Sequence, residues 1–282
     1  MRWLGYVTLI CALCLAGQLD AQTQKPVKKK QATEKKSEKK AAKGEPKKSI
    51  SMVQGSKMAR PTTNLDPGSV GYYFYPMTPG SHWTMRTVKS VYDLDNKLLA
   101  SDTLFSTETV STNSAASIQG LPLIKCISKS YKPGQSKDAA SAEEVTYYVD
   151  DSLIMAVFNN SITHSQNVAL LTTPLREGFM WPERFEDTIA TKVISMKEPV
   201  ETPAGRFENA VVTSTKLGQG ELSKYFVGQK GIVKMVFRGP AAGGRGTMVV
   251  MTDLMELHHE TGHMEGSPAP APAEERWDPT MK

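Results

Sequence analysis

The sequence predicts an all-β domain, a curved antiparallel sheet that forms a half-barrel or barrel, with a disordered basic N-terminal linker before it. From Gly68 onward, short runs rich in Val, Ile, Thr, Tyr and Phe alternate with Gly, Pro, Asn and Asp, at the spacing of all-β domains. Several runs place apolar residues on both faces of the expected strand, which indicates a sheet that curls around a core. Helical periodicity is weak, and its best candidate is a turn or two at residues 182–187.

Four segments divide the 282 residues. Residues 1–21 are expected to be a signal peptide, because Arg2 precedes an apolar run and Leu19-Asp-Ala21 resembles a small-residue cleavage site. Residues 22–66 form a disordered lysine-rich linker, residues 67–260 the antiparallel β domain, and residues 261–282 a flexible tail rich in Pro and Ala. Cys14 lacks the leucine three residues upstream that a lipoprotein signal requires, so we expect free export, to the periplasm or as a secreted protein.

Positive charge is concentrated in the linker. Residues 22–48 contain eleven lysines and three glutamates, whereas the whole chain has a net charge of +5, so the β domain is mildly acidic. A nucleic-acid-binding fold carries basic residues on one face beside aromatic side chains, so no nucleic-acid partner is expected. The linker is interpreted as a solvated spacer, with attachment to an anionic polymer or lipid surface of the envelope as the alternative.

Six strands are expected in the first half of the domain. Residues 82–93 begin after the turn residues Pro79-Gly80, and Asp95-Asn96-Lys97 turns the chain into the threonine-rich run 98–112. Residues 118–131 end at a polar loop opened by Pro133-Gly134, and residues 143–149 and 153–158 flank a turn at Asp150-Asp151. A short strand at residues 168–172 completes this half.

Five more strands are expected in the second half, at residues 189–197, 207–216, 221–227, 232–238 and 247–258. Pro203-Ala-Gly205 makes a hairpin turn that directs Phe207 into the core. The glycine-rich residues 239–246 lack the Gly-Lys-Ser/Thr ending of a phosphate loop and are interpreted as a hairpin connection. Short connections throughout make an up-and-down order the simplest topology.

His259-Glu260-Thr261-Gly262-His263 fits the His-Glu-x-x-His pattern of zinc hydrolases, in which two histidines one helical turn apart bind zinc and the glutamate activates water. The surrounding sequence is unfavourable, because residues 247–258 are expected to form a strand, and Gly266 and Pro268 prevent a long helix afterwards. A zinc hydrolase acting through His259, Glu260 and His263 is therefore the weakest functional hypothesis. We expect no metal, no cofactor and no catalytic residue.

Aromatic residues cluster near the starts of expected strands. Five of them are candidates for a ligand-binding groove or for core packing: Tyr73, Tyr75, Trp83, Trp181 and Tyr225. Core packing is the favoured interpretation, since strands favour aromatic residues. Cys126, the only cysteine beyond the signal peptide, is interpreted as a small buried apolar residue.

Residues 73–87 contain Tyr75-Pro76 and Pro79-Gly80 before Trp83, and residues 202–212 begin Thr-Pro-Ala-Gly-Arg-Phe. These passages resemble the Tyr-x-Pro-x-x-Pro-Gly-x-x-Trp and Thr-Pro-Ala-Gly-x-Phe signatures of an uncharacterised group of exported bacterial all-β proteins, a domain of unknown function. Met85 departs from the group, which usually has an aromatic residue there. The resemblance spans residues 72–258 and implies a curved antiparallel sheet and a cell-envelope location. It supplies no catalytic residue.

The leading functional hypothesis is an exported, non-catalytic β domain that serves as a binding or structural module of the cell envelope. Its ligand is unknown. The alternative is a carrier that holds an apolar or lipid ligand within the curled sheet. A well-packed interior favours the first hypothesis, and an enclosed cavity of ligand size favours the second.

Overall fold

The described part of the chain consists of antiparallel strands, which confirms the predicted all-β class. This computed structural model describes residues 68–74, 78–111, 117–118, 121–159, 161–162, 164–184 and 189–260. The predicted signal peptide, linker and tail lie outside these residues, as do Tyr75 and His263. The helices of the described ranges are short 3-10 turns, η2 (Gly71–Tyr73), η3 (Lys137–Ala139) and η4 (Ala242–Gly244).

The strands alternate with turns along the whole domain, close to the predicted positions. They are β1 (His82–Tyr92), β2 (Leu98–Val110), β3 (Ser117–Ile118), β4 (Leu121–Tyr131), β5 (Ala142–Val149), β6 (Leu153–Val157), β7 (Val168–Thr172), β8 (Met180–Pro182), β9 (Ala190–Thr202), β10 (Gly205–Leu217), β11 (Gly220–Val227), β12 (Gly231–Pro240) and β13 (Thr247–His258). Two predictions need correction. Met180–Pro182 forms a strand where the helical turn was expected to begin, and β9 runs five residues beyond Lys197.

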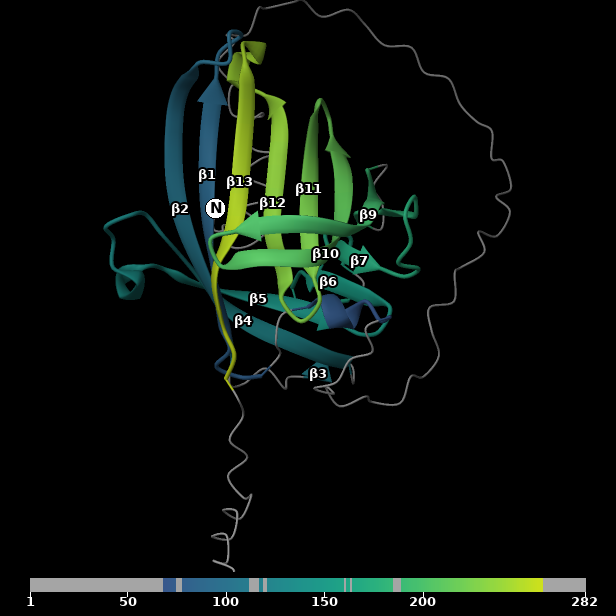
Figure 1. Cartoon of the computed structure of the whole chain (residues 1–282). Coiled ribbons are helices and arrows are strands. Elements are labelled where there is room, and N and C mark those ends of the chain that lie inside the picture. The colour runs from purple at the N-terminus through teal and green to yellow at the C-terminus, as the bar shows by residue number, and fades with distance from the viewer. Residues whose placement is uncertain are drawn as a thin grey trace, which may run out of the picture.

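Strands that are neighbours in the sheet are mostly neighbours in the chain. The order is β7-β6-β5-β4-β2-β1-β13-β12-β11-β10-β9-β8, and β3 pairs with β4. The sheet curls round on itself (Figure 1), and hydrogen bonds join its two edge strands, β7 and β8, at a seam. There the Ala169 N–H of β7 donates to Glu183 O at 2.9 Å, and the Trp181 indole of β8 donates to Ala169 O at 3.2 Å. The strands therefore have the predicted up-and-down order, and the sheet forms a nearly closed barrel.

Alternation along each strand fills the interior of the barrel. On β11, Leu222, Lys224 and Phe226 are buried, whereas the side chains between them on the opposite face are partly exposed. The largest fully buried side chains of the core include Trp83, Tyr147, Phe226 and Leu254, contributed by β1, β5, β11 and β13. Burying such side chains is the main contribution to folding free energy in a β domain of this kind.

The segment before β1 closes one end of the barrel. Val70 is fully buried, and its N–H donates to Asp151 O at 2.9 Å in the β5–β6 turn. The Phe74 ring packs on the Tyr147 ring with centroids 5.2 Å apart. Residues 68–74 therefore act as a plug for the barrel interior.

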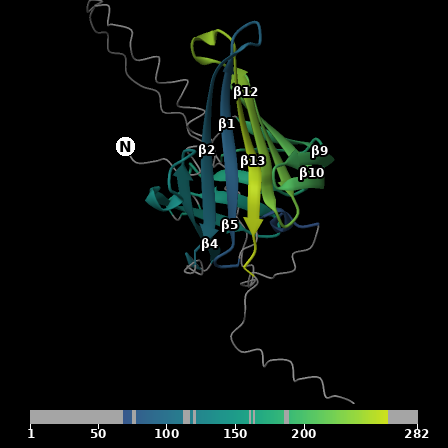
Figure 2. The ribbon, with the colours of Figure 1, turned by 60° about the vertical axis from the view of Figure 1, so that its left-hand side comes forward.

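The hairpin of β9 and β10 extends beyond the barrel wall and folds over its outer face. β10 pairs with β11 only from Val211 onward, and register shifts and a positive φ of 58° at Asn209 bend the strand before that point. The free ends of β9 and β10 cross in front of β12 and β13 in Figure 1. In Figure 2 they lie on the side of these strands opposite to β4 and β5. We call residues 198–210 the arm.

Candidate functional site

An ion pair lies inside the barrel, next to the seam. Lys224 Nζ of β11 lies 3.1 Å from Glu183 Oε1, and the two side chains are 0% and 5% exposed. Lys224 points inward because it shares strand parity with Leu222 and Phe226. Glu183 follows β8 and accepts the Ala169 N–H through its backbone carbonyl. The pair therefore connects the seam to β11, three strands away in the sheet, and each charge neutralises the other in a site almost completely removed from water.

Buried threonines of β9 and β10 lie on the wall next to this ion pair. Thr213 of β10 is the cross-strand partner of Lys224, and Thr191 and Thr215 share a hydrogen bond of 2.7 Å. The Thr213 hydroxyl is buried and has no hydrogen-bond partner among the described residues. This polar strip lines the wall formed by β9, β10 and β11.

A buried carboxyl group lies on the other side of the interior. Glu108 of β2 is 2% exposed and faces Trp83 across the β1–β2 pairing. The Tyr147 hydroxyl donates to Glu108 Oε2 at 3.1 Å. Burial raises the pKa of Glu108 to about 8, although the Tyr147 hydrogen bond acts to lower it. At neutral pH Glu108 is therefore mainly protonated.

Cys126 is fully buried in the core, as the sequence predicted. Burial raises the pKa of its thiol above the ordinary value, and the charge of Glu108 raises it further. A thiol acts as a nucleophile only when deprotonated. Cys126 therefore packs as an apolar residue and is unsuited to covalent chemistry.

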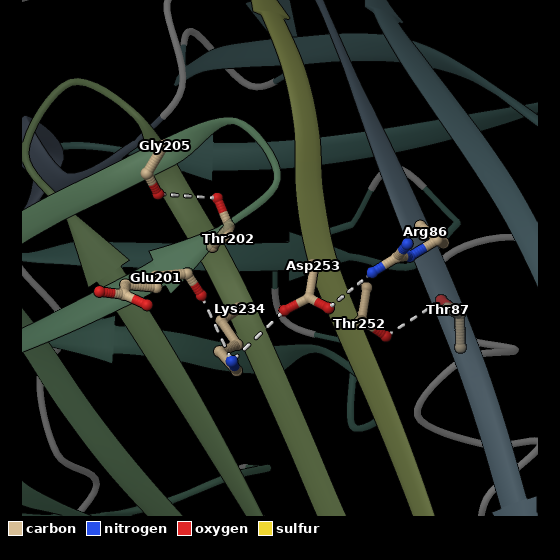
Figure 3. Close-up of polar contacts among 8 residues, drawn as sticks. All are labelled: Arg86, Thr87, Glu201, Thr202, Gly205, Lys234, Thr252 and Asp253. Carbon is tan, nitrogen blue, oxygen red and sulfur yellow. Dashed lines mark hydrogen bonds and ion pairs between the residues drawn. The ribbon is translucent and has the colours of Figure 1, made fainter.

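A second polar cluster lies on the outer face, beneath the arm (Figure 3). Asp253 of β13 lies between two cations, with Arg86 Nη2 at 3.6 Å and Lys234 Nζ at 3.5 Å. The Asp253 side chain is only 4% exposed. Lys234 Nζ also donates to the carbonyl of Glu201 in the arm at 3.4 Å. The cluster therefore bridges three strands of the barrel wall to the arm.

The turn of the arm rests directly on β13. The Ala204 N–H donates to Leu254 O at 3.1 Å, and the Thr202 hydroxyl donates to Gly205 O at 3.3 Å across the turn. Residues 202–205 belong to the Thr-Pro-Ala-Gly-x-Phe passage, so the predicted hairpin turn is confirmed. Phe207 packs partly buried against the main hydrophobic cluster. This motif therefore holds the arm on the barrel.

The predicted aromatic residues occupy three different environments. Trp83 is 1% exposed in the core, and Trp181 is buried at the seam. Tyr225 lies on the outer face of β11, opposite Lys234, where burial and the charge of Glu198 raise its pKa. Tyr75 lies outside the described residues. The four described aromatic residues form no common groove, because Trp83 and Tyr225 point to opposite faces of the sheet.

Tyr73 lines a small cavity between the plug and the barrel core. The other lining residues are Phe74, Tyr147, Ile154, Leu170, Phe226, Gly231 and Ile232. The cavity volume is about 10 Å³, which is close to the minimum for one water molecule. Ligand pockets for small molecules are typically ~300 Å³ or larger.

The described part of the His-Glu-x-x-His passage is a strand end. β13 continues to His258, and His259 and Glu260 follow outside any helix or strand. The Glu260 N–H donates to the Ser81 hydroxyl at 3.0 Å. Its Cγ atom would lie 2.8 Å from a Cβ atom placed on Gly80. Glu260 therefore packs against the chain that enters β1, in a geometry unlike a zinc-hydrolase helix.

Histidine residues do come together at this end of the barrel, although His263 is outside the described residues. The rings of His82 and His258, which are cross-strand partners, stack with centroids 5.0 Å apart. Burial and the positive charge of Lys230 lower the pKa of His259. Within the described ranges, no three metal-ligating side chains are placed to hold a metal ion together.

Three polar groups, each built around a buried charged side chain, had not been expected from the sequence: Glu183 with Lys224, Glu108 with Tyr147, and Asp253 with Arg86 and Lys234. Strand parity was a usable signal for Lys224, because an inward-facing lysine between Leu222 and Phe226 requires a buried partner. No comparable signal identified its partner. Glu183 is 41 positions away, beside a strand too short to show alternation.

Among known proteins, the chain is similar to solved structures but to no family model and no curated sequence. Two solved structures are similar to the chain, a predicted lipoprotein from Parabacteroides distasonis and a predicted exported protein with a YmcC-like fold from Bacteroides fragilis. Each has 12% sequence identity and a TM-score of 0.39, and each match covers 66% of this chain. The matches cover 98% and 99% of those chains, respectively.

Proposed function

We propose that this chain is an exported, non-catalytic β-barrel module of the cell envelope, whose interior stabilises the fold and whose outer surface binds envelope components. The packing of the interior is the observation that carries the proposal. Inside the barrel, Glu183 pairs with Lys224, and Glu108 pairs with Tyr147. The polar groups of each pair therefore contact their partner and do not face an open cleft. The cavity beside Tyr73 has room for about one water.

The sequence supports the export and envelope parts of the proposal. Residues 1–21 have the composition of a signal peptide, and the Thr-Pro-Ala-Gly-x-Phe passage resembles an exported group. The lysine-rich residues 22–48 suit contact with an anionic polymer or lipid surface. None of the helices in the described ranges combines the length and hydropathy that a membrane crossing requires.

Cell fractionation combined with crosslinking tests this function. The full-length gene product is expressed in its own host, and the processed chain is followed through cytoplasmic, soluble exported and membrane fractions. We expect the chain to lose residues 1–21 and to crosslink reproducibly to envelope components. Recovery of unprocessed chain in the cytoplasm would contradict the proposal.

A lipid carrier is the alternative, and the aromatic cavity beneath the plug is the observation that favours it. Its lining by Tyr73, Phe74 and Phe226 is mainly apolar, but a lipid chain would fit only if the plug moved away. Mass spectrometry of the purified exported chain under native conditions separates the two functions. A structural or surface-binding module should show only the mass of the polypeptide. A carrier should show an added mass of several hundred daltons from one bound lipid.

A further inference from the structure

Exposed leucines are concentrated at one end of the molecule. The large hydrophobic side chains that are most exposed in the described residues are Leu94, Leu98, Leu99, Met180 and Ile194. Three of them lie within six positions at the turn between β1 and β2, where their exposed fractions are 79%, 52% and 61%. Clusters of exposed apolar side chains commonly mark interaction sites.

This turn projects from the barrel. The ends of β1, β2, β12 and β13 rise above the arm in Figure 1, and Figure 2 shows the same projection from another side. The β12–β13 connection packs against the turn, because a Cβ atom on Gly246 would lie 2.0 Å from Tyr92 O. We call residues 92–99 and 241–246 the tip. The leucines therefore lie on a convex end and not in a groove.

Four backbone N–H groups of the turn, those of Asp93, Asp95, Asn96 and Lys97, donate hydrogen bonds within it. The Asp93 carboxylate accepts the N–H groups of Asp95 and Lys97, both at 2.9 Å. The Asp93 N–H donates to Lys97 O at 3.0 Å, and the Asn96 N–H donates to Asp93 O at 3.2 Å. A turn that enters an apolar medium must have its backbone donors paired, because an unpaired group costs several kcal/mol there.

We propose that the tip docks on a lipid bilayer and inserts Leu94, Leu98 and Leu99 among the lipid chains. The three side chains together expose on the order of 100–250 Å², judged from the area that corresponds to burying leucine and from their exposed fractions. A stable protein–protein interface buries ~800 Å² on each partner, so the three leucines alone would make up only a small part of one. Insertion into a bilayer needs no complementary surface.

The charges of the tip predict how this docking depends on the lipid. Asp93 and Asp95 are balanced by Lys97 and Arg245, so the tip has no net charge. Binding through the tip should therefore occur on zwitterionic lipid and resist salt. Attachment through the lysine-rich residues 22–48 should require anionic lipid and weaken with salt. The need for anionic lipid and the sensitivity to salt therefore distinguish binding through the linker from binding through the tip.

Vesicle sedimentation tests the inference, which rests on the proposed envelope function. The chain from Gln22 onward is mixed with vesicles of phosphatidylcholine, alone or with phosphatidylglycerol, at low and high salt. The test variant is Leu94→Ser/Leu98→Ser/Leu99→Ser. The matched control is Met180→Ser/Ile194→Ser, which removes the other exposed hydrophobic side chains. Thermal unfolding of both variants checks that the fold is intact.

We expect the unaltered chain and the control to bind phosphatidylcholine vesicles in high salt, and the test variant to lose at least about ten-fold in partitioning. A second readout is a Leu94→Cys variant with a polarity-sensitive dye, because Cys126 is buried and should remain unlabelled. The dye should report an apolar environment when vesicles are added.

Three results would overturn the inference. The first is that the unaltered chain does not bind phosphatidylcholine vesicles, and the second is that the test variant binds them equally well. The third is that the dye at position 94 still reports an aqueous environment when the protein is bound to vesicles. If the leucine substitutions instead abolish a crosslink to an envelope protein, the tip is a protein-docking surface. Envelope fractionation of the unaltered chain does not depend on these results, so the proposed function can stand when the lipid inference fails.

Discussion

Lys224 and Glu183 form an ion pair inside the barrel, with Nζ and Oε1 3.1 Å apart and both side chains almost completely removed from water. Two buried charges are tolerated only together, because removal of one leaves the other without a partner in a medium of low polarity. The carbonyl of Glu183 also accepts the Ala169 N–H, so the same residue closes the seam. The ion pair therefore couples the closing of the barrel to its interior packing.

Replacing Lys224 by Met should destabilise the domain strongly. The charge of Glu183 would then be buried without a partner, which typically costs about 3–5 kcal/mol of unfolding free energy. Urea unfolding of Lys224→Met and of Lys224→Met/Glu183→Leu measures this. The double variant should recover most of the loss, because it removes both charges.

The matched control is Lys216→Met, which breaks the exposed ion pair of Lys216 with Glu221. Its effect should stay below about 0.5–1 kcal/mol, as is usual for surface pairs. If Lys224→Met were as mild as the control, the buried pair would have no role in closing the barrel.

The Glu108 carboxyl predicts a pH dependence of stability. Burial raises its pKa from an ordinary value of 4.5 to about 8 in the folded chain. Between these two pH values the folded state keeps a proton that the unfolded state has released. The contribution of Glu108 to the unfolding free energy should therefore be highest below about pH 4.5. It should fall as the pH rises toward 8 and level off above 8.

Glu108→Gln should remove this contribution, because the amide has a similar shape and no titration in this range. Urea unfolding between about pH 5 and pH 8 measures how the unfolding free energy falls with pH in each protein. The fall should be smaller in the variant than in the unaltered chain, by up to ~1.4 kcal/mol per pH unit. All other ionisable groups are the same in both proteins, so the difference between the two curves isolates Glu108. Parallel curves would show that Glu108 is ionised in the folded state.

Strand positions were largely predictable because the strands of this barrel alternate in polarity. Residues 82–93 and 221–227 were predicted, and the strands are His82–Tyr92 and Gly220–Val227. The extension of β9 to Thr202 was missed, since Lys197-Glu198-Pro199 is exposed and has neither alternation nor β-branched residues. A stretch of consecutive exposed residues inside a strand has no hydrophobic signal.

The polar clusters were harder to predict, because their members are distant in the chain. Arg86 and Asp253 are separated by more than half of the sequence and meet only when β1 pairs with β13. The arm turn at Ala204 reaches Leu254 by folding over the outside of the sheet, which no local pattern indicates. The Thr-Pro-Ala-Gly passage predicted the turn itself, but not the surface on which it rests.

Trp83 provides a direct test of core packing. It is 1% exposed and pairs with Leu257 of β13 and Glu108 of β2. Trp83→Ala should lower the unfolding free energy by about 3–5 kcal/mol through lost apolar contacts and a cavity. The exposed Leu98→Ala serves as the control and should change stability by less than ~0.5 kcal/mol. A stable Trp83→Ala variant would instead assign Trp83 to a ligand-binding surface.

The arm should be released from the barrel when Asp253 loses its charge. Asp253→Asn weakens the attraction of both cations, and Lys234 then no longer has a fixed position from which to donate to Glu201 O. The loss in unfolding free energy should be about 1–3 kcal/mol, as for other buried charged hydrogen-bonding groups. Local opening of the arm should be larger than this global effect.

Hydrogen exchange measured by mass spectrometry separates the local from the global effect. In Asp253→Asn, peptides that contain the Ala204 amide should exchange faster, whereas peptides from β11 should keep their protection. Asp102→Asn is the matched control, because it removes the same charge from an exposed ion pair with Lys132. Unchanged exchange at Ala204 would show that the Leu254 carbonyl and apolar packing hold the arm without the ion cluster. Uniformly faster exchange would indicate that Asp253 stabilises the whole barrel and not the arm in particular.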